Sequence, residues 1–139
     1  MKPSDVPRKL VLHDSVINSI DHDPVAHTLR IEIELCNYMQ KWYRDSEPEM
    51  VRGSLLFSAV ASVRAEPDLA GLAWSEQFDG QILRVTSVDG SPAEMETLKF
   101  AIETSDYRTK EEGMLILEVS AGECIWRGEQ GAGLLESSS

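Results

Sequence analysis

The sequence predicts a mainly β protein: an antiparallel six- to seven-stranded sandwich or barrel with at most one short helix. Apolar residues recur most often with a period of two, which is typical of strands with one face in the core and one in water. Short turn-like segments join these runs. The 139 residues contain no strand-helix alternation and no G-x-G-x-x-G or G-x-x-x-x-G-K-[ST] motif. A nucleotide-binding α/β fold is therefore not expected, and no cofactor is predicted.

The clearest strand is predicted over residues 28–36. One of its sides carries only apolar residues, namely Leu29, Ile31, Ile33 and Leu35, and the other carries charged ones. This alternation is typical of a half-solvated antiparallel strand. A shorter run at residues 16–21 precedes it, and the Asp-Pro pair between the two favours a turn. We expect the two runs to form a hairpin.

Further strands are predicted along the rest of the chain. Residues 50–64 have apolar side chains at both odd and even positions, which indicates a long strand covered over part of both faces. Residues 81–88 and 96–103 flank the turn-forming sequence Asp-Gly-Ser-Pro at residues 89–92, so they are predicted to pair as a hairpin.

The last strand is predicted over residues 114–121. Residues 124–126 are expected to extend it past a kink or bulge at Gly122.

One segment favours a helix, residues 67–78, where Pro67 occupies the first position and a short apolar face follows. We expect a single β-rich domain over residues 1–127. Residues 128–139 are rich in Gly and Ser, so we expect a disordered tail there.

Charge is distributed unevenly around a net value of −11. Residues 1–64 carry 9 acidic and 8 basic side chains, whereas residues 65–139 carry 15 acidic and 5 basic ones. Such a chain repels phosphate backbones, so nucleic acid is not an expected partner. An acidic surface instead attracts a basic protein.

No segment approaches the length of apolar sequence needed to span a bilayer, and the first residues lack the apolar run of a signal peptide. We therefore expect a cytoplasmic protein without a membrane partner. The two cysteines, Cys36 and Cys124, are too few for a disulfide framework and are expected to be buried, reduced thiols.

The segment L-H-D-S-V-I-N-S-I-D-H-D, residues 12–23, contains two His-Asp pairs. An extended chain places them on the order of 30 Å apart, too far for one metal ion. His22, Asp23 and His27 bracket a single turn and form a candidate metal site, since two imidazoles and a carboxylate suit zinc or a similar ion. The alternative is a polar turn in which Asp23 accepts backbone hydrogen bonds.

His13, Asp14 and Ser15 have the residue types of a hydrolytic triad. Neighbouring strand residues point to opposite faces, so we expect these three instead to support the chain where it enters its first strand.

An aromatic-rich stretch, N-Y-M-Q-K-W-Y-R, follows the strand predicted at residues 28–36. It contains the candidate interaction residues Tyr38, Lys41, Trp42, Tyr43 and Arg44. Aromatic and arginine side chains are typical of interface hot spots. The alternatives are that the aromatic rings cap the core or stack on a small ligand.

The pattern L-H-D-S-V-I-N-S-I followed by T-L-R-I-E-I-E-L resembles the start of small uncharacterised bacterial domains, in which a leading His-Asp-Ser introduces a first hairpin. Some similar small acidic proteins act as immunity proteins against toxins. The resemblance covers residues 12–35 and brings no catalytic residues with it.

The function predicted first is that of a small acidic cytoplasmic binding protein, not an enzyme, with an immunity-like or other protein-interaction role. One alternative is a metal-binding module or small metal-assisted hydrolase at His22, Asp23 and His27. Another is a structural domain whose unpaired strand edges form a homodimer.

Overall fold

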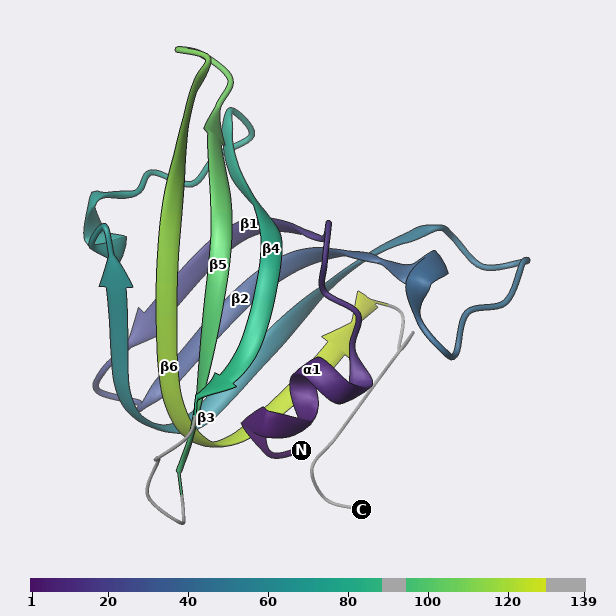
Figure 1. Ribbon diagram of the computed structural model, residues 1–139, viewed down its shortest axis with the longest axis horizontal. Coiled ribbons are helices and arrows are strands. Elements are labelled where there is room, and N and C mark those ends of the chain that lie inside the picture. Colours follow the sequence, from purple (N-terminus) through teal and green to yellow (C-terminus); the bar gives the residue numbers. More distant parts are fainter. Residues whose placement is uncertain (89–94, 130–139) are drawn as a thin grey trace.

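Six antiparallel strands form a closed barrel in the computed structural model, which describes residues 1–88 and 95–129 (Figure 1). They are β1 (Val16–Asp23), β2 (Thr28–Cys36), β3 (Met50–Glu66), β4 (Phe78–Val88), β5 (Glu96–Asp106) and β6 (Glu111–Gly128). Around the barrel the order is β1-β2-β3-β6-β5-β4. The predicted mainly β fold is confirmed, and the closed sheet selects the barrel over the sandwich.

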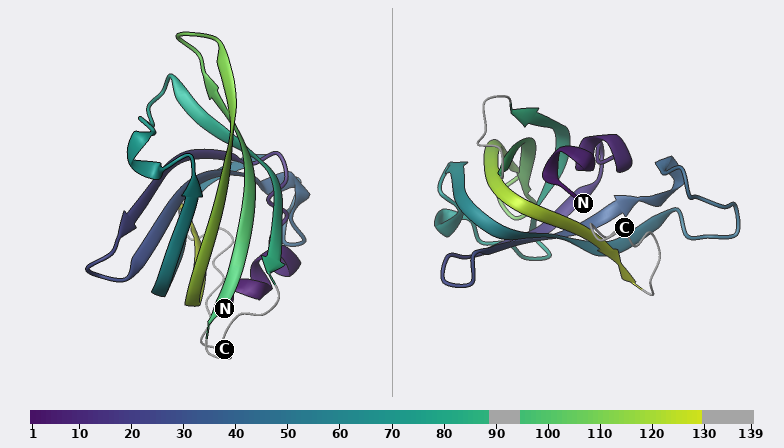
Figure 2. Two further views of the ribbon diagram at one scale, coloured as in Figure 1. Left: turned by 60° about the vertical axis from the view of Figure 1, so that its left-hand side comes forward. Right: turned by 90° about the horizontal axis from the view of Figure 1, so that it is seen from below.

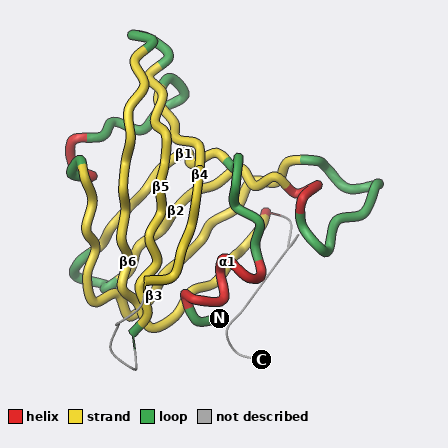
Figure 3. The backbone as a smooth tube through the Cα atoms, viewed as in Figure 1, coloured by secondary structure: helices red, strands yellow, loops and turns green. Residues whose placement is uncertain are grey.

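Helical structure is limited to short turns within the described residues (Figure 3). These are the 3₁₀ helix η1 (Pro3–Asp5), the α-helix α1 (Val6–Lys9), and the 3₁₀ helices η2 (Asn37–Met39) and η3 (Leu69–Gly71).

The predicted hairpin of the first two strands is confirmed, and its alternation defines the barrel interior. β1 pairs with β2 antiparallel along its length. The apolar side of β2 is almost completely buried, at 0–1% exposure for Leu29, Ile31, Ile33 and Leu35. Arg30, on the opposite side, is exposed. Interior and exterior residues alternate in this way along barrel strands generally.

β3 and β6 are long, bent strands, and each forms part of both halves of the barrel (Figures 1 and 2). In β6 the buried positions change parity between Ala121 and Cys124, in agreement with the kink expected at Gly122. On β3, Ala59 has a φ of 51° and the register with β6 shifts between Val60 and Ser62. Such irregularities sharpen the local bend of a strand. The paired bend turns one sheet into a barrel.

The seam between β1 and β4 closes the barrel with few contacts. The two strands pair only at Val16↔Gln81 and Ile17↔Gly80. The register of β1 with β2 then shifts around Asn18, which is the position of an extra residue. A bulge of this kind terminates pairing and redirects the strand. Beyond Asn18, therefore, β1 diverges from β4.

The first residues cover one end of the barrel (Figure 1). Met1, Val6, Leu10 and Leu12 are buried in the core cluster. The Cys124 backbone N–H donates to the Met1 carbonyl at 2.8 Å, which ties this segment to β6. Sequence reasoning did not predict η1 and α1, because they are short and their apolar residues are separated by prolines and charges.

The prediction of a helix over residues 67–78 is wrong. Only η3 is helical there, and its single turn is capped by the Asp68 side chain, which accepts from the Ala70 N–H. Leu72 already has extended backbone angles. Leu72 and Trp74 pack on the core while Ala73 is exposed, so the segment follows a strand-like period of two.

The second predicted hairpin is also confirmed, because β4 and β5 pair from Phe78↔Asp106 to Val88↔Thr97. The turn predicted at residues 89–92 lies outside the described residues. The same applies to residues 130–139 of the predicted tail.

Large side chains fill the barrel. Trp126, Phe57 and Phe100 are fully buried, and the rings of Phe57 and Phe100 meet edge to face with centroids 6.4 Å apart. Gly53 makes room for the indole, since a Cβ there would lie 2.5 Å from a ring carbon of Trp126. The interior is thus a packed core, as expected for a small barrel.

Replacing Gly53 by Ala should destabilise the protein by about 1–3 kcal/mol, because the added methyl group overpacks the site beside Trp126. Urea unfolding would measure this change. Gly71→Ala is the matched control, since a Cβ at Gly71 meets nothing within 4 Å, and it should change stability by less than about 0.5 kcal/mol. Equal effects of the two substitutions would contradict the packing.

Both cysteines should be unreactive in the native protein. Cys36 and Cys124 are buried and form no disulfide, as predicted. Burial raises the pKa of the Cys124 thiol far above its ordinary value, and a thiol that stays protonated is a poor nucleophile. Ellman's reagent should release little colour from the folded protein and titrate both thiols in guanidinium chloride. Fast modification of the folded protein would contradict this burial.

Candidate functional site

The candidate metal residues lie around the turn between β1 and β2, with His22 and Asp23 at the end of β1 and His27 directly before β2. The Asp23 carboxylate Oδ1 accepts from the backbone N–H groups of Val25 and Ala26, each at 3.0 Å. His27 has a φ of 56°, and its carbonyl accepts from the Val60 N–H at 2.9 Å. Asp23 therefore accepts the backbone hydrogen bonds of a polar turn, which was the expected alternative to a metal site. Within residues 1–88 and 95–129, no group of three or more His, Cys, Asp or Glu side chains is placed to hold a metal ion.

The segment with His13, Asp14 and Ser15 has the strand-entry role expected for it. The Ser15 hydroxyl is buried and accepts from the Cys36 N–H at 3.1 Å, so it is engaged within the fold. His13 Nε2 lies 3.3 Å from an Asp14 carboxylate oxygen, and its Nδ1 lies 3.1 Å from the Leu83 carbonyl.

The candidate interaction residues lie in the connection between β2 and β3, residues 37–49, which we call the arm. Figures 1 and 2 show the arm projecting from the barrel wall. Antiparallel neighbours need a loop of only about 2–5 residues, whereas the arm has 13. Its length is therefore not required to join the two strands.

Asn37 holds the two sides of the arm together. Its side-chain amide donates to the Pro48 carbonyl at 2.9 Å, and its Oδ1 accepts from the Trp42 indole N–H at 2.8 Å. The Tyr38 N–H donates to the Glu49 carbonyl at 3.1 Å. Because Asn37 is only 1% exposed, these bonds are formed away from bulk water.

Gln40 ties the arm to the barrel. Its side-chain amide donates to the carbonyls of Val11 and Cys36, at 2.8 and 2.9 Å, and its Oε1 accepts from the Val11 N–H at 2.9 Å. Sequence reasoning missed both Asn37 and Gln40. Their only signal is an amide placed beside aromatic residues, which does not reveal a partner far along the chain.

The five predicted interaction residues divide into two groups. Tyr38 is 51% exposed, and Lys41 and Arg44 are also exposed. Trp42 is half-buried against the core, and the Tyr43 hydroxyl donates to the Glu47 carbonyl at 3.4 Å. The first three residues are thus presented to solvent, whereas the last two support the arm.

Three carboxylates of the arm lie near Tyr43. Partial burial raises the pKa of Tyr43, and the nearby carboxylates of Glu49, Asp45 and Glu47 raise it further. The arm therefore carries two exposed cations, Lys41 and Arg44, together with the carboxylates of Asp45, Glu47 and Glu49.

A second feature lies where β1 leaves β4. A hollow of about 400 Å³ opens between the end of β1, the end of β3 and η3. We call it the seam groove. Its walls include the apolar side chains of Ile20, Val63, Ala65 and Leu69. Asp21, Asp68 and the candidate metal residue His22 also line it.

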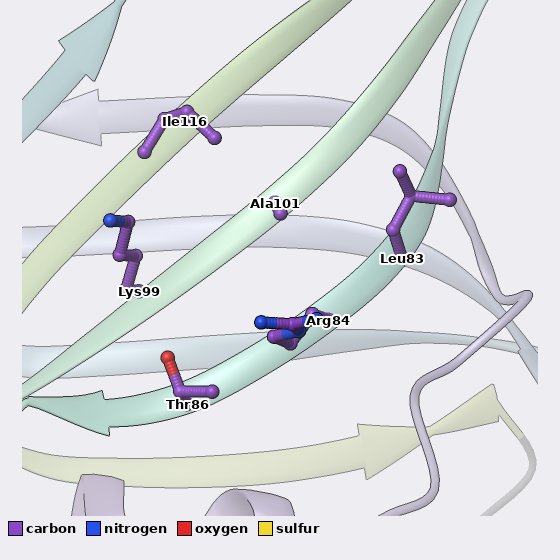
Figure 4. A pocket seen from close by; sticks show the side chains of 6 residues that line it. All are labelled: Leu83, Arg84, Thr86, Lys99, Ala101 and Ile116. Carbon is purple, nitrogen blue, oxygen red and sulfur yellow. The ribbon is translucent and has the colours of Figure 1, made fainter.

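A second hollow, of about 360 Å³, lies on the outer face of β4, β5 and β6 (Figure 4). It forms because the small Ala101 stands in register between Arg84 and Ile116. Lys99 also lines it, which gives the hollow two cations. Glu118 lies directly across from Lys99 in the ladder, so the local charge is partly balanced. Because of this balance, the hollow is a weaker candidate for a binding site than the arm or the seam groove.

Asn37→Ala should loosen the arm without opening the barrel. The substitution removes the partners of the Pro48 carbonyl and the Trp42 indole, so we expect a loss of about 1–3 kcal/mol in stability. Amide hydrogen exchange should accelerate across residues 38–49 and stay slow in β2 and β3. Asn18→Ala is the control, because no described residue forms a hydrogen bond with the Asn18 side chain. Unchanged exchange in the arm would contradict its buried support.

The arm thus presents the exposed side chains of Tyr38, Lys41 and Arg44, and the seam groove opens beyond the point where β1 diverges from β4. No helix within the described residues is long and apolar enough to cross a membrane. Comparisons of the chain with protein-family models, with curated proteins and with solved structures find no match.

Proposed function

We propose that the protein is a non-enzymatic cytoplasmic binding protein that holds a basic protein partner through the arm. The observation that carries this proposal is the arm itself, a 13-residue connection held in place by buried hydrogen bonds. Ordered loops of this length in compact domains are commonly functional.

The support of the arm favours binding energetically. A partner would meet side chains on a backbone that Asn37 and Gln40 already hold, so less conformational entropy is lost on association. Tyr38 and Arg44 supply the aromatic and guanidinium groups that often dominate interface energies. Their exposure leaves them accessible to a partner.

The charge of the chain favours a basic partner. A net charge of −11 attracts cationic proteins over a distance and accelerates their encounter at low salt. The arm also carries the carboxylates of Asp45, Glu47 and Glu49, which add negative charge at the proposed contact. An immunity-like role against a basic toxin is one form of this function. The metal-binding module and the homodimer stay predictions.

Substituting Tyr38 and Arg44 together by Ala should weaken partner binding at least about tenfold, because both side chains belong to types that dominate hot spots. The tagged protein and its variant would be used to capture partners from source-organism lysate at low and high salt. Mass spectrometry would identify and quantify the captured proteins.

The matched control is the double substitution Tyr107→Ala with Arg108→Ala, which removes an exposed Tyr-Arg pair from the turn between β5 and β6. A basic protein kept by the wild type and the control, lost by the arm variant and weakened by salt would support the proposal. Equal capture by all three proteins, or capture of no protein at either salt concentration, would overturn it.

A further inference from the structure

The seam groove lies beside an unpaired strand edge. On the side away from β2, β1 pairs with β4 only as far as Ile17. From Asn18 to Asp23, the described residues provide no backbone partner on that side. Natural proteins commonly cover or charge such edges, because an extended segment of another chain can pair with them. Here η3 lies across the gap, but no hydrogen bond within the described residues joins it to β1.

The groove has an apolar interior. Ile20 on β1 is 6% exposed, and Val63 and Ala65 on β3 are half-buried against the core. Leu69 forms the facing wall, on the turn that Asp68 caps. Because Ala65 is small, these walls leave a hollow of about 400 Å³ and do not close on one another.

The rim of the groove carries two carboxylates and lies beside the imidazole of His22. Asp21 and Asp68 both line it, and neither forms an ion pair within the described residues. Arg30 lies opposite Asp21 in the ladder but contacts Glu32. Asp68 uses Oδ1 to accept from the Ala70 N–H at 3.1 Å. Two carboxylates on different elements thus stand over an apolar hollow.

An arginine side chain matches this arrangement. Its aliphatic stem packs against apolar walls while its charged end stays at the polar rim. The planar guanidinium presents several donors to carboxylates and is less strongly hydrated than an ammonium group, which favours it over lysine at a partly buried site. An unpaired edge beside the hollow accommodates the backbone that carries such a residue.

We propose that the seam groove binds an arginine side chain on an extended segment of the partner, with that segment pairing along the free edge of β1. The inference rests on the proposed function and specifies a second contact beyond the arm. It identifies Asp21 and Asp68 as the carboxylates that receive the guanidinium, and Ile20, Val63 and Leu69 as the walls that receive its stem.

A peptide titration tests this site without the natural partner. The probe is acetyl-Thr-Val-Arg-Val-Thr-amide, and its matched control carries citrulline, which has nearly the same shape but no charge, in place of arginine. The full chain, labelled with ¹⁵N, is followed by two-dimensional NMR. We expect saturable shifts of the Ile20, Val63 and Leu69 amides with a Kd of about 1 mM or tighter, and binding of the citrulline peptide at least about tenfold weaker.

Two variants assign the binding to the groove. Asp21→Asn combined with Asp68→Asn should weaken the arginine peptide at least about tenfold, and Asn at residue 68 still caps the turn. Ala65→Leu should block binding by filling the hollow from another wall. Asp45→Asn combined with Glu49→Gln, an equal change of charge on the exposed arm, should leave peptide affinity unchanged within about twofold.

The outcomes separate this site from the arm. No saturable shift, equal binding of both peptides, or shifts confined to other strands would overturn the groove inference even if the arm variant loses its partner. Groove shifts that appear on raising the protein concentration alone would make a second copy of this chain the occupant and would also overturn it. Peptide binding at the groove, with partner capture unaffected by the arm variant, would reject the arm and keep the groove.

Discussion

Closure of the barrel depends on β3 and β6 bending together. These strands pair along most of their length, and both change direction where Ala59 takes a positive φ and where the buried parity of β6 changes near Gly122. The bend lets each strand contribute to both halves of the barrel. It also brings Phe57 and Trp126 into one core. Because curvature is concentrated there, β1 and β4 meet only briefly, and the seam groove follows from that short contact.

The strands were largely predictable from the sequence because period-two alternation is a local property. The alternation of β2 identifies its buried face, and the β4–β5 pair follows from two apolar runs around a turn. Strand order and barrel closure could not be predicted, since they depend on pairings between distant residues. The helix predicted over residues 67–78 failed for a related reason. Contacts of Leu72 and Trp74 with the barrel outweigh the weak helical pattern of the segment.

The candidate site was predictable in composition but not in organisation. Aromatic and basic residues marked the arm, and Tyr38, Lys41 and Arg44 are exposed. The support from Asn37 and Gln40 involves Val11 and Pro48, whose proximity appears only in the folded chain. The seam groove left no local signal at all, because Ile20, Val63 and Leu69 belong to three separate elements.

The pairing of β3 with β6 also has a consequence for the order of folding. Gly53 pairs with Gly128 and Glu66 with Ile116, so the ladder joins residues that are 50 to 75 positions apart in the chain. Non-local pairings of this kind slow folding, because loop entropy is lost before contacts compensate for it. During synthesis, the edge of β3 that pairs with β6 has no partner until β6 has left the ribosome. In that interval the apolar residues of β3 are exposed, and chaperones or early pairing with β2 would protect the nascent chain from aggregation.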